Sequence, residues 1–153
     1  MDPSNAENEL RNALTAFETS VTTPIVSGEL ANWMEDVQAT WSPASTQVHN
    51  HINDLHPRQY QEISQEDPSL FQQIELLKAE DETIERERDK LNREIAQVAQ
   101  QIPNLEPDEA KARRHVKHLI DGGVALVARV RKQEVAVQTW FVEAFDRERG
   151  GGD

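Results

Sequence analysis

Cysteine is absent from the 153-residue sequence. The chain therefore cannot form disulfides, use a thiolate as a nucleophile, or bind zinc or an iron–sulfur cluster through cysteine. Long apolar runs are missing too, because no window approaches the roughly 18 consecutive apolar residues that a membrane span needs. The first ten residues, MDPSNAENEL, are acidic and polar and do not resemble a secretory signal. We therefore expect a cytoplasmic protein that does not associate with membranes.

Signatures of catalysis are also missing from the sequence. It contains no glycine-rich phosphate loop, no H-E-x-x-H motif, no nucleophile elbow and no EF-hand loop. Basic charge is scarce: the net charge is -12, and residues 1–77 hold twelve acidic but only two basic residues. An acidic surface repels phosphate backbones, so we expect no nucleic-acid partner. No catalytic residue and no enzymatic activity are predicted.

What the sequence does contain is helical periodicity. Apolar residues recur at spacings of three and four in four segments that are separated by proline or glycine. This pattern predicts an all-α protein with a single domain over residues 1–153, an elongated antiparallel four-helix bundle of up-down-up-down topology. The predicted helices cover residues 3–22, 28–56, 68–102 and 107–149, and Pro43 predicts a kink or break in the second of them.

The clearest periodicity lies between Leu70 and Ile102. Ten positions there follow alternating steps of four and three, and eight of them hold Leu, Ile or Val. They form a coiled-coil-type stripe about 50 Å long. The first helix is shorter and the second is interrupted, so we expect residues 91–102 or 116–127 to lack a partner within the chain. A homodimer or a protein partner would cover them, unless residues 57–66 or a bent second helix fold over this end instead.

Two adjacent glycines, Gly122 and Gly123, interrupt the fourth segment. Together they cost roughly 2 kcal/mol of helix propensity. They predict a close helix contact or a local distortion of the helix.

Three charged residues occupy core positions of the predicted helices: Asp81, Arg88 and Glu134. An unpaired buried charge costs several kcal/mol, so we expect a buried polar layer in which Arg88 pairs with Asp81 or Glu134. Two interpretations stay open. The layer is either an ion pair that fixes the alignment of the helices or a remnant or modified polar site.

The histidines are the other candidates for chemistry. His49 and His56 are seven residues apart and share one face of a regular helix, near Ile52. His51 and His118 fall outside the apolar stripes, so we expect them in solvent. A metal site needs three or more convergent ligands, and the spacing alone brings only two histidines together.

Two stretches resemble the hemerythrin-like family of four-helix bundles. DPSLFQQIELLKAEDETIERERDKL is similar to the entry of that family's third helix, where a Leu-Phe turn leads into an "AEH" helix, and RKQEVAVQTWFVEAFDRERGGGD is similar to its last helix. The resemblance covers about residues 65–100 and 127–153. It implies a bundle of the kind in which five histidines and two carboxylates hold two iron ions.

The chain departs from this family at the ligand positions. Asp81 stands where the "AEH" histidine would be, and Val130 replaces the histidine four residues before the matching acid, Glu134. No histidine is followed four residues later by His or Glu. The resemblance therefore implies that the bundle is retained while the family's metal centre is lost.

Two functions follow from these observations. The favoured one is a non-enzymatic helical bundle without a cofactor, which acts through helix-face protein–protein contacts or self-association. The alternative is a divergent hemerythrin-like protein that binds iron at a carboxylate-rich site in the bundle core. Its candidate ligands are His49, His56, Asp81, Glu85 and Glu134. Arg88 argues against this alternative, because a guanidinium in the same layer would replace the metal cation.

Overall fold

The computed structural model describes residues 3–105 and 109–151, and within these residues it contains helices and no strand. The predicted all-α class is thus confirmed. The elements in chain order are α1 (Pro3–Thr22), α2 (Leu30–Asn50), a π-helical turn (His51–Leu55), α3 (His56–Glu66), a 3-10 turn (Pro68–Leu70), α4 (Phe71–Leu105) and α5 (Glu109–Gly151). None of the described helices is both long enough and apolar enough to cross a bilayer.

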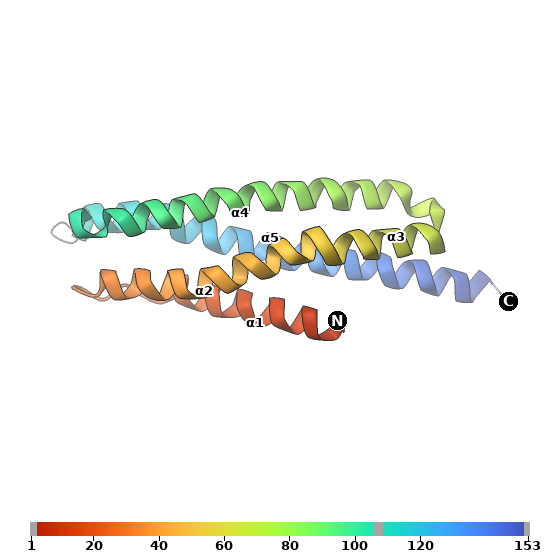
Figure 1. The fold of residues 1–153 in the computed structure, drawn as a ribbon, viewed down its shortest axis with the longest axis horizontal. Coiled ribbons are helices and arrows are strands. Elements are labelled where there is room, and N and C mark those ends of the chain that lie inside the picture. The colour runs from red at the N-terminus through yellow and green to blue at the C-terminus, as the bar shows by residue number, and fades with distance from the viewer. Residues whose placement is uncertain (1–2, 106–108, 152–153) are drawn as a thin grey trace.

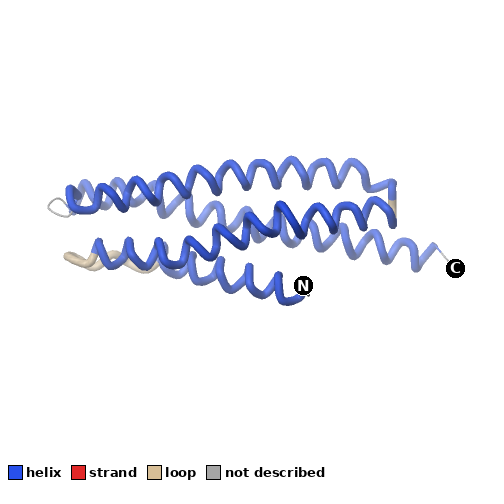
Figure 2. Tube along the Cα trace, viewed as in Figure 1, coloured by secondary structure: helices blue, strands red, loops and turns tan. Residues whose placement is uncertain are grey.

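The elements are arranged as long rods (Figure 1). α4 and α5 lie side by side along most of the molecule. α2, the π turn and α3 follow one another without interruption and form a third rod (Figure 2). α1 packs against α2 and α5 and accompanies them along only part of their length. The N-terminal end of α1 therefore lies near the middle of the molecule, and the last part of α5 continues past it.

The second predicted helix differs from the structure in the place of its irregularity. A break near Pro43 is wrong, because α2 continues through this residue, which lies on the exposed face. Trp41, Ala44 and Val48 are buried on the other face. Proline removes only one backbone hydrogen bond, and the packing on both sides of it stabilises the helix. The irregular segment is the π turn, which ends two residues before Pro57.

The stripe of α4 is buried as predicted. The seven apolar stripe positions within α4 are buried, and so is the eighth, Leu70, which ends the preceding 3-10 turn. α4 continues through Pro103, where the sequence predicts its end, to Leu105. The predicted start of the fourth helix at residue 107 lies outside the described residues.

Two apolar cores lie along the rods. α1, α2, α4 and α5 form the larger core, and α3, α4 and α5 form the smaller core around Ile63, Ile74 and Val137. The predicted unpartnered end is therefore wrong. The stripe positions within 91–102 and 116–127 belong to the larger core, because both α1 and α2 reach that end of the molecule. The opposite end, beyond the N-terminal end of α1, is the one built from fewer helices.

Gly122 and Gly123 lie inside α5, which is continuous at this point. A Cβ atom at Gly123 would lie 3.2 Å from Cζ of Phe17 on α1, whereas a Cβ atom at Gly122 would have its nearest neighbours at 3.9 Å. The predicted close helix contact is confirmed at Gly123, where α1 and α5 approach each other.

This difference predicts unequal effects of alanine at the two glycines. We expect Gly122→Ala to raise the free energy of unfolding by about 0.5–1 kcal/mol, because alanine favours the helix. Gly123→Ala should gain less or lose stability, because the ring of Phe17 must move. Urea denaturation of both variants measures the difference, and equal gains would contradict the close approach of Phe17.

Candidate metal centre

The π turn determines where two histidine side chains point. The backbone N–H of His56 donates to the carbonyl of His51, five residues earlier. A π turn is wider than an α turn, so residues five apart come onto roughly one face. Both histidines are buried, and their ring centroids are 6.1 Å apart. Pro57 follows directly and has no N–H to donate to Asn53, which lies within the turn.

The ring of His56 lies between two carboxylates from different helices. Its Nδ1 is 3.0 Å from Oδ1 of Asp81 on α4, and its Nε2 is 2.7 Å from Oε1 of Glu134 on α5. The side chain of His56 is 1% exposed and that of Asp81 is 7% exposed, whereas Glu134 retains 23%. One imidazole thus connects three helices at a buried point.

Asp81 accepts hydrogen bonds from two more side chains. The hydroxyl of Tyr60 donates to Oδ2 at 2.7 Å, and Nε2 of Gln133 donates to Oδ1 at 2.9 Å. Gln133 also donates to the carbonyl of Leu77, and both Tyr60 and Gln133 are buried. A carboxylate with three donors can be held inside an apolar core. These donors fix the orientation of Asp81 towards Nδ1 of His56.

His51 presents an unpaired nitrogen to the same cluster. Its Nε2 is 3.0 Å from the carbonyl oxygen of Ala6 on α1, which can only accept, so Nε2 carries the hydrogen. In the neutral ring, Nδ1 then carries a lone pair. This atom is buried, has no hydrogen-bond partner, and lies 3.4 Å from Oε2 of Glu134. Two acceptors therefore face each other, an arrangement that requires a proton or a cation between them.

The cluster is electrostatically coupled. Burial by itself would lower the pKa of His56, but its hydrogen bonds to Asp81 and Glu134 and their charges outweigh burial and raise this pKa to about 9. Burial would raise the pKa of Glu134, but hydrogen bonds from His51 and His56 and their positive charges lower it to about 2. The contribution of His51 applies when a proton, and not a metal ion, lies between its Nδ1 and Glu134. The pKa of Tyr60 is raised by burial and by Asp81. Without another cation, His56 carries the positive charge that stabilises the two carboxylates.

The structure brings together three of the residues that the sequence singles out: His56, Asp81 and Glu134. It places His49 and Glu85 elsewhere, 3.0 Å apart and outside the core. The expected common face of His49 and His56 is wrong, because the π turn between them changes the helical phase.

The expected pairing of Arg88 is also wrong. Its guanidinium bonds to Glu85, Asp89 and Ser45. His56, and not Arg88, lies between Asp81 and Glu134. The guanidinium of Arg88 therefore lies outside this layer and does not take the place of a metal cation between Asp81 and Glu134.

Three residues of the cluster are not predicted from the sequence: His51, Tyr60 and Gln133. His51 was expected in solvent but is 3% exposed, whereas His118 lies in solvent as expected. Gln133 precedes Glu134 directly. Which of the two faces the core depends on how α5 is rotated about its own axis, and the structure places Gln133 there. Pro57 was the one sequence feature that could have indicated the position of His51. Proline disturbs the helical hydrogen bonding of the preceding turn, and this changes which face of the helix His51 occupies.

No family model, curated protein or solved structure matches this chain significantly.

His51, His56 and Glu134 form a donor set of two imidazoles and one carboxylate. Their donor atoms all lie within 4.8 Å of one another. A tetrahedral zinc ion bound by nitrogen and oxygen at 2.0–2.1 Å separates its ligand atoms by about 3.3 Å, so only a small closure of the side chains is needed. Apolar side chains surround the donors on the core side: Val48, Ile52, Ile84 and Val130.

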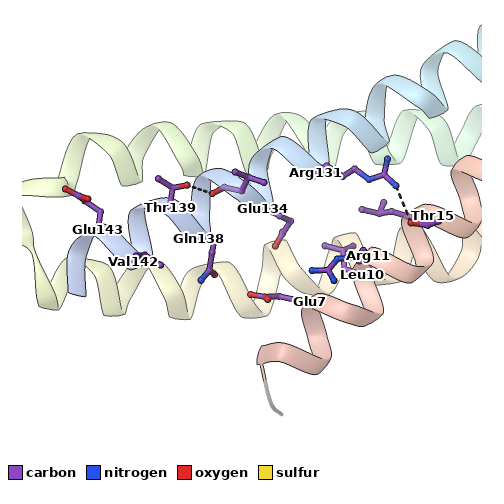
Figure 3. Close-up of a pocket in the computed structure, with 12 residues that line it drawn as sticks. Glu7, Leu10, Arg11, Thr15, Arg131, Glu134, Gln138, Thr139, Val142 and Glu143 are labelled. Atoms are coloured by element: carbon purple, nitrogen blue, oxygen red, sulfur yellow. Dashed lines mark hydrogen bonds between the residues drawn. The ribbon is translucent and has the colours of Figure 1, made fainter. Parts of the chain in front are cut away.

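Glu134 connects this cluster with solvent. It also lines an open groove of about 900 Å³ between α1 and the C-terminal part of α5 (Figure 3). The imidazoles lie behind it in the core. The carboxylate of Glu134 thus stands between the groove and the two histidines, where an ion would enter.

Proposed function

We propose that this chain binds one divalent first-row transition-metal ion through Nδ1 of His51, Nε2 of His56 and the carboxylate of Glu134. The observation that carries the proposal is the buried lone pair of His51 Nδ1, which faces Oε2 of Glu134 without a hydrogen-bond partner. A metal ion at this position would accept electron pairs from all three side chains and neutralise the carboxylate.

The outer contacts of both histidines support this proposal. The nitrogens that do not face Glu134 are engaged: Nε2 of His51 lies against the carbonyl of Ala6, and Nδ1 of His56 lies against Asp81. Such contacts fix the tautomer and the ring orientation of metal-binding histidines and make them better ligands. Imidazole and carboxylate together suit Zn²⁺ and Fe²⁺.

This function modifies the alternative drawn from the sequence. His51 replaces His49 and Glu85 as a ligand, and Asp81 becomes an outer contact of His56 in place of a ligand. It is a binding function and needs no enzymatic activity. We also infer that neighbouring rods run antiparallel in up-down-up-down order. The short connection between α1 and α2 and the single residue Asp67 between α3 and the 3-10 turn support this order.

Metal titration of the untagged, chelator-treated protein tests the proposal. We expect one equivalent of Zn²⁺ or, without oxygen, of Fe²⁺ to bind in calorimetry and to remain after dialysis, as measured by elemental analysis. His51→Ala removes one donor and leaves the contact between His56 and Asp81 intact, so it should weaken binding roughly 100-fold or more. Glu134→Gln keeps the size of the side chain and should weaken binding similarly.

His118→Ala is the matched control, because this exposed histidine lies on α5 away from the cluster. Its metal affinity should equal that of the unmodified chain. Absence of binding to the unmodified chain, or full binding to a folded His51→Ala variant, would refute the proposal and leave a protonated polar network.

A further inference from the structure

A second feature adjoins the metal site and shares Glu134 with it. The last part of α5 carries an apolar face that the described residues of the chain leave open. Val135 is 67% exposed and Val142 is 44% exposed. They are seven residues apart, so they lie two turns apart on one face of α5. Gln138 and Thr139 lie between them on the same face and also line the groove.

The groove begins beside the N-terminal part of α1 and runs along the C-terminal part of α5 (Figure 3). Its walls are the N-terminal part of α1, including Leu10 and Leu14, and the exposed face of α5 (Figure 3). In the larger core, α1 is one of the helices that pack against α5. The described part of α1 ends beside the groove, whereas α5 continues past it (Figure 1), and Val135 and Val142 are exposed on this part of α5. The groove therefore has the shape and the apolar walls that accept a further helix.

The face of α5 is complementary to itself. If two copies of α5 lie antiparallel, with their two-fold axis between Gln138 and Thr139, Val135 meets the partner's Val142 and Gln138 meets the partner's Thr139. In the same register Arg131 meets the partner's Asp146. Glu134 does not oppose a like charge, because Glu134 and Glu143 lie on opposite flanks of this face.

Charge supports this arrangement. Arg11 and Arg131 line the end of the groove nearer α1, together with Glu7, whereas Glu143 lies at the other end and the exposed Asp146 lies beyond it. An antiparallel two-fold pair brings the end with the arginines against the end with Glu143 and Asp146. Arg131 already bonds to Glu18 and Thr15, which holds its guanidinium at the rim of the groove.

We propose that this chain forms a two-fold dimer in which residues 131–146 of α5 occupy the groove of a second copy. The contact is isologous, so both copies bury the same face. The paired segments are only about 24 Å long. The dimer is therefore expected to be weak, with a dissociation constant in the micromolar range.

Sedimentation equilibrium between about 1 and 200 μM tests this proposal, on both chelator-treated and metal-loaded protein. We expect the mass to rise with concentration from 17.4 kDa towards twice this value. Val135→Glu should raise the dissociation constant at least tenfold, because it buries two carboxylates at the contact. The control is Leu76→Glu, since Leu76 is 72% exposed on α4 outside the groove, and it should leave the dissociation constant unchanged.

A charge exchange tests the register. Asp146→Arg should weaken the dimer by placing two guanidiniums together, and the additional change Arg131→Asp should restore part of the affinity. A monomer at 200 μM, an unchanged dimer in Val135→Glu, or dissociation by Leu76→Glu would each overturn the proposal. A monomer that still binds metal would overturn the dimer and leave the metal site standing.

Discussion

His56→Ala should lower the free energy of unfolding of the metal-free protein by about 3 kcal/mol or more. The imidazole of His56 is the cation between Asp81 and Glu134, and it is 1% exposed. Removing one partner of a buried ion pair leaves an uncompensated charge and costs about 3–5 kcal/mol. Glu134 can turn towards the groove, but Asp81 cannot reach water. Urea denaturation with a chelator present measures the loss.

A double variant separates the charge from the lost volume. Asp81→Asn removes the buried charge and retains an oxygen that accepts from Tyr60 or Gln133. His56→Ala combined with Asp81→Asn should therefore be less destabilised than His56→Ala alone, although it carries one more substitution. His118→Ala should stay within about 0.5 kcal/mol of the unmodified chain. A double variant that is less stable than His56→Ala would show that Asp81 does not depend on His56 for its charge balance.

The stability of the metal-free protein should fall by about 3 kcal/mol as the pH rises from 6.5 to 9. The pKa of His56 is 6.5 in the unfolded chain and about 9 in the fold. The protonated ring therefore stabilises the fold fully below pH 6.5, and this contribution is lost as the pH rises through 9. Asp81 and Glu134 face the ring directly, Tyr60 reaches it through Asp81, and His51 lies beside it.

At the acidic end, stability depends on Glu134 through its contacts with His51 and His56. Its pKa is lowered from 4.5 to about 2, so its contribution is present above pH 4.5 and is lost as the pH falls through 2. The shift of Glu134 includes its contact with His51 as well as the ion pair with His56, and this ion pair also contributes to the shift of His56, so the two shifts overlap and are not added. Urea denaturation at pH 6, 7.5 and 9 measures how the free energy of unfolding falls as the pH rises. The control variant His118→Ala should show the same pH dependence as the unmodified chain. A flat profile from pH 6.5 to 9 would mean that His56 is neutral in the fold.

The sequence predicts the helices well where periodicity is strong. α1 has the predicted bounds, and the stripe of α4 is buried over its full length. Spacings of three and four residues arise from the geometry of the α-helix itself, so they can be read without knowing the neighbours of a helix. The buried position of Asp81 follows from the same rule, whereas Glu134 keeps 23% of its side chain exposed and the neighbouring Gln133 is the buried residue.

The partners within the cluster were not predictable in this way. The periodicity rule assumes a constant 3.6 residues per turn, and the π turn violates it between His49 and His56. Arg88 occupies a stripe position, but its long side chain reaches Glu85 and Ser45 at the edge of the helix contact. A stripe position fixes the direction of the Cβ atom and does not fix where the end of a long side chain bonds.

The π turn is equivalent to one residue inserted into a regular helix. Val48 and the residues before it follow one buried pattern, and His56, Tyr60 and Ile63 continue it one position later than an α-helix would. Deleting Ile52, Asn53 or Asp54 would turn the two buried histidines into a pair four residues apart on an uninterrupted helix. Their five-residue spacing is therefore the α-helical i, i+4 pair with one residue added, and a search for paired histidines at helical spacing does not find it.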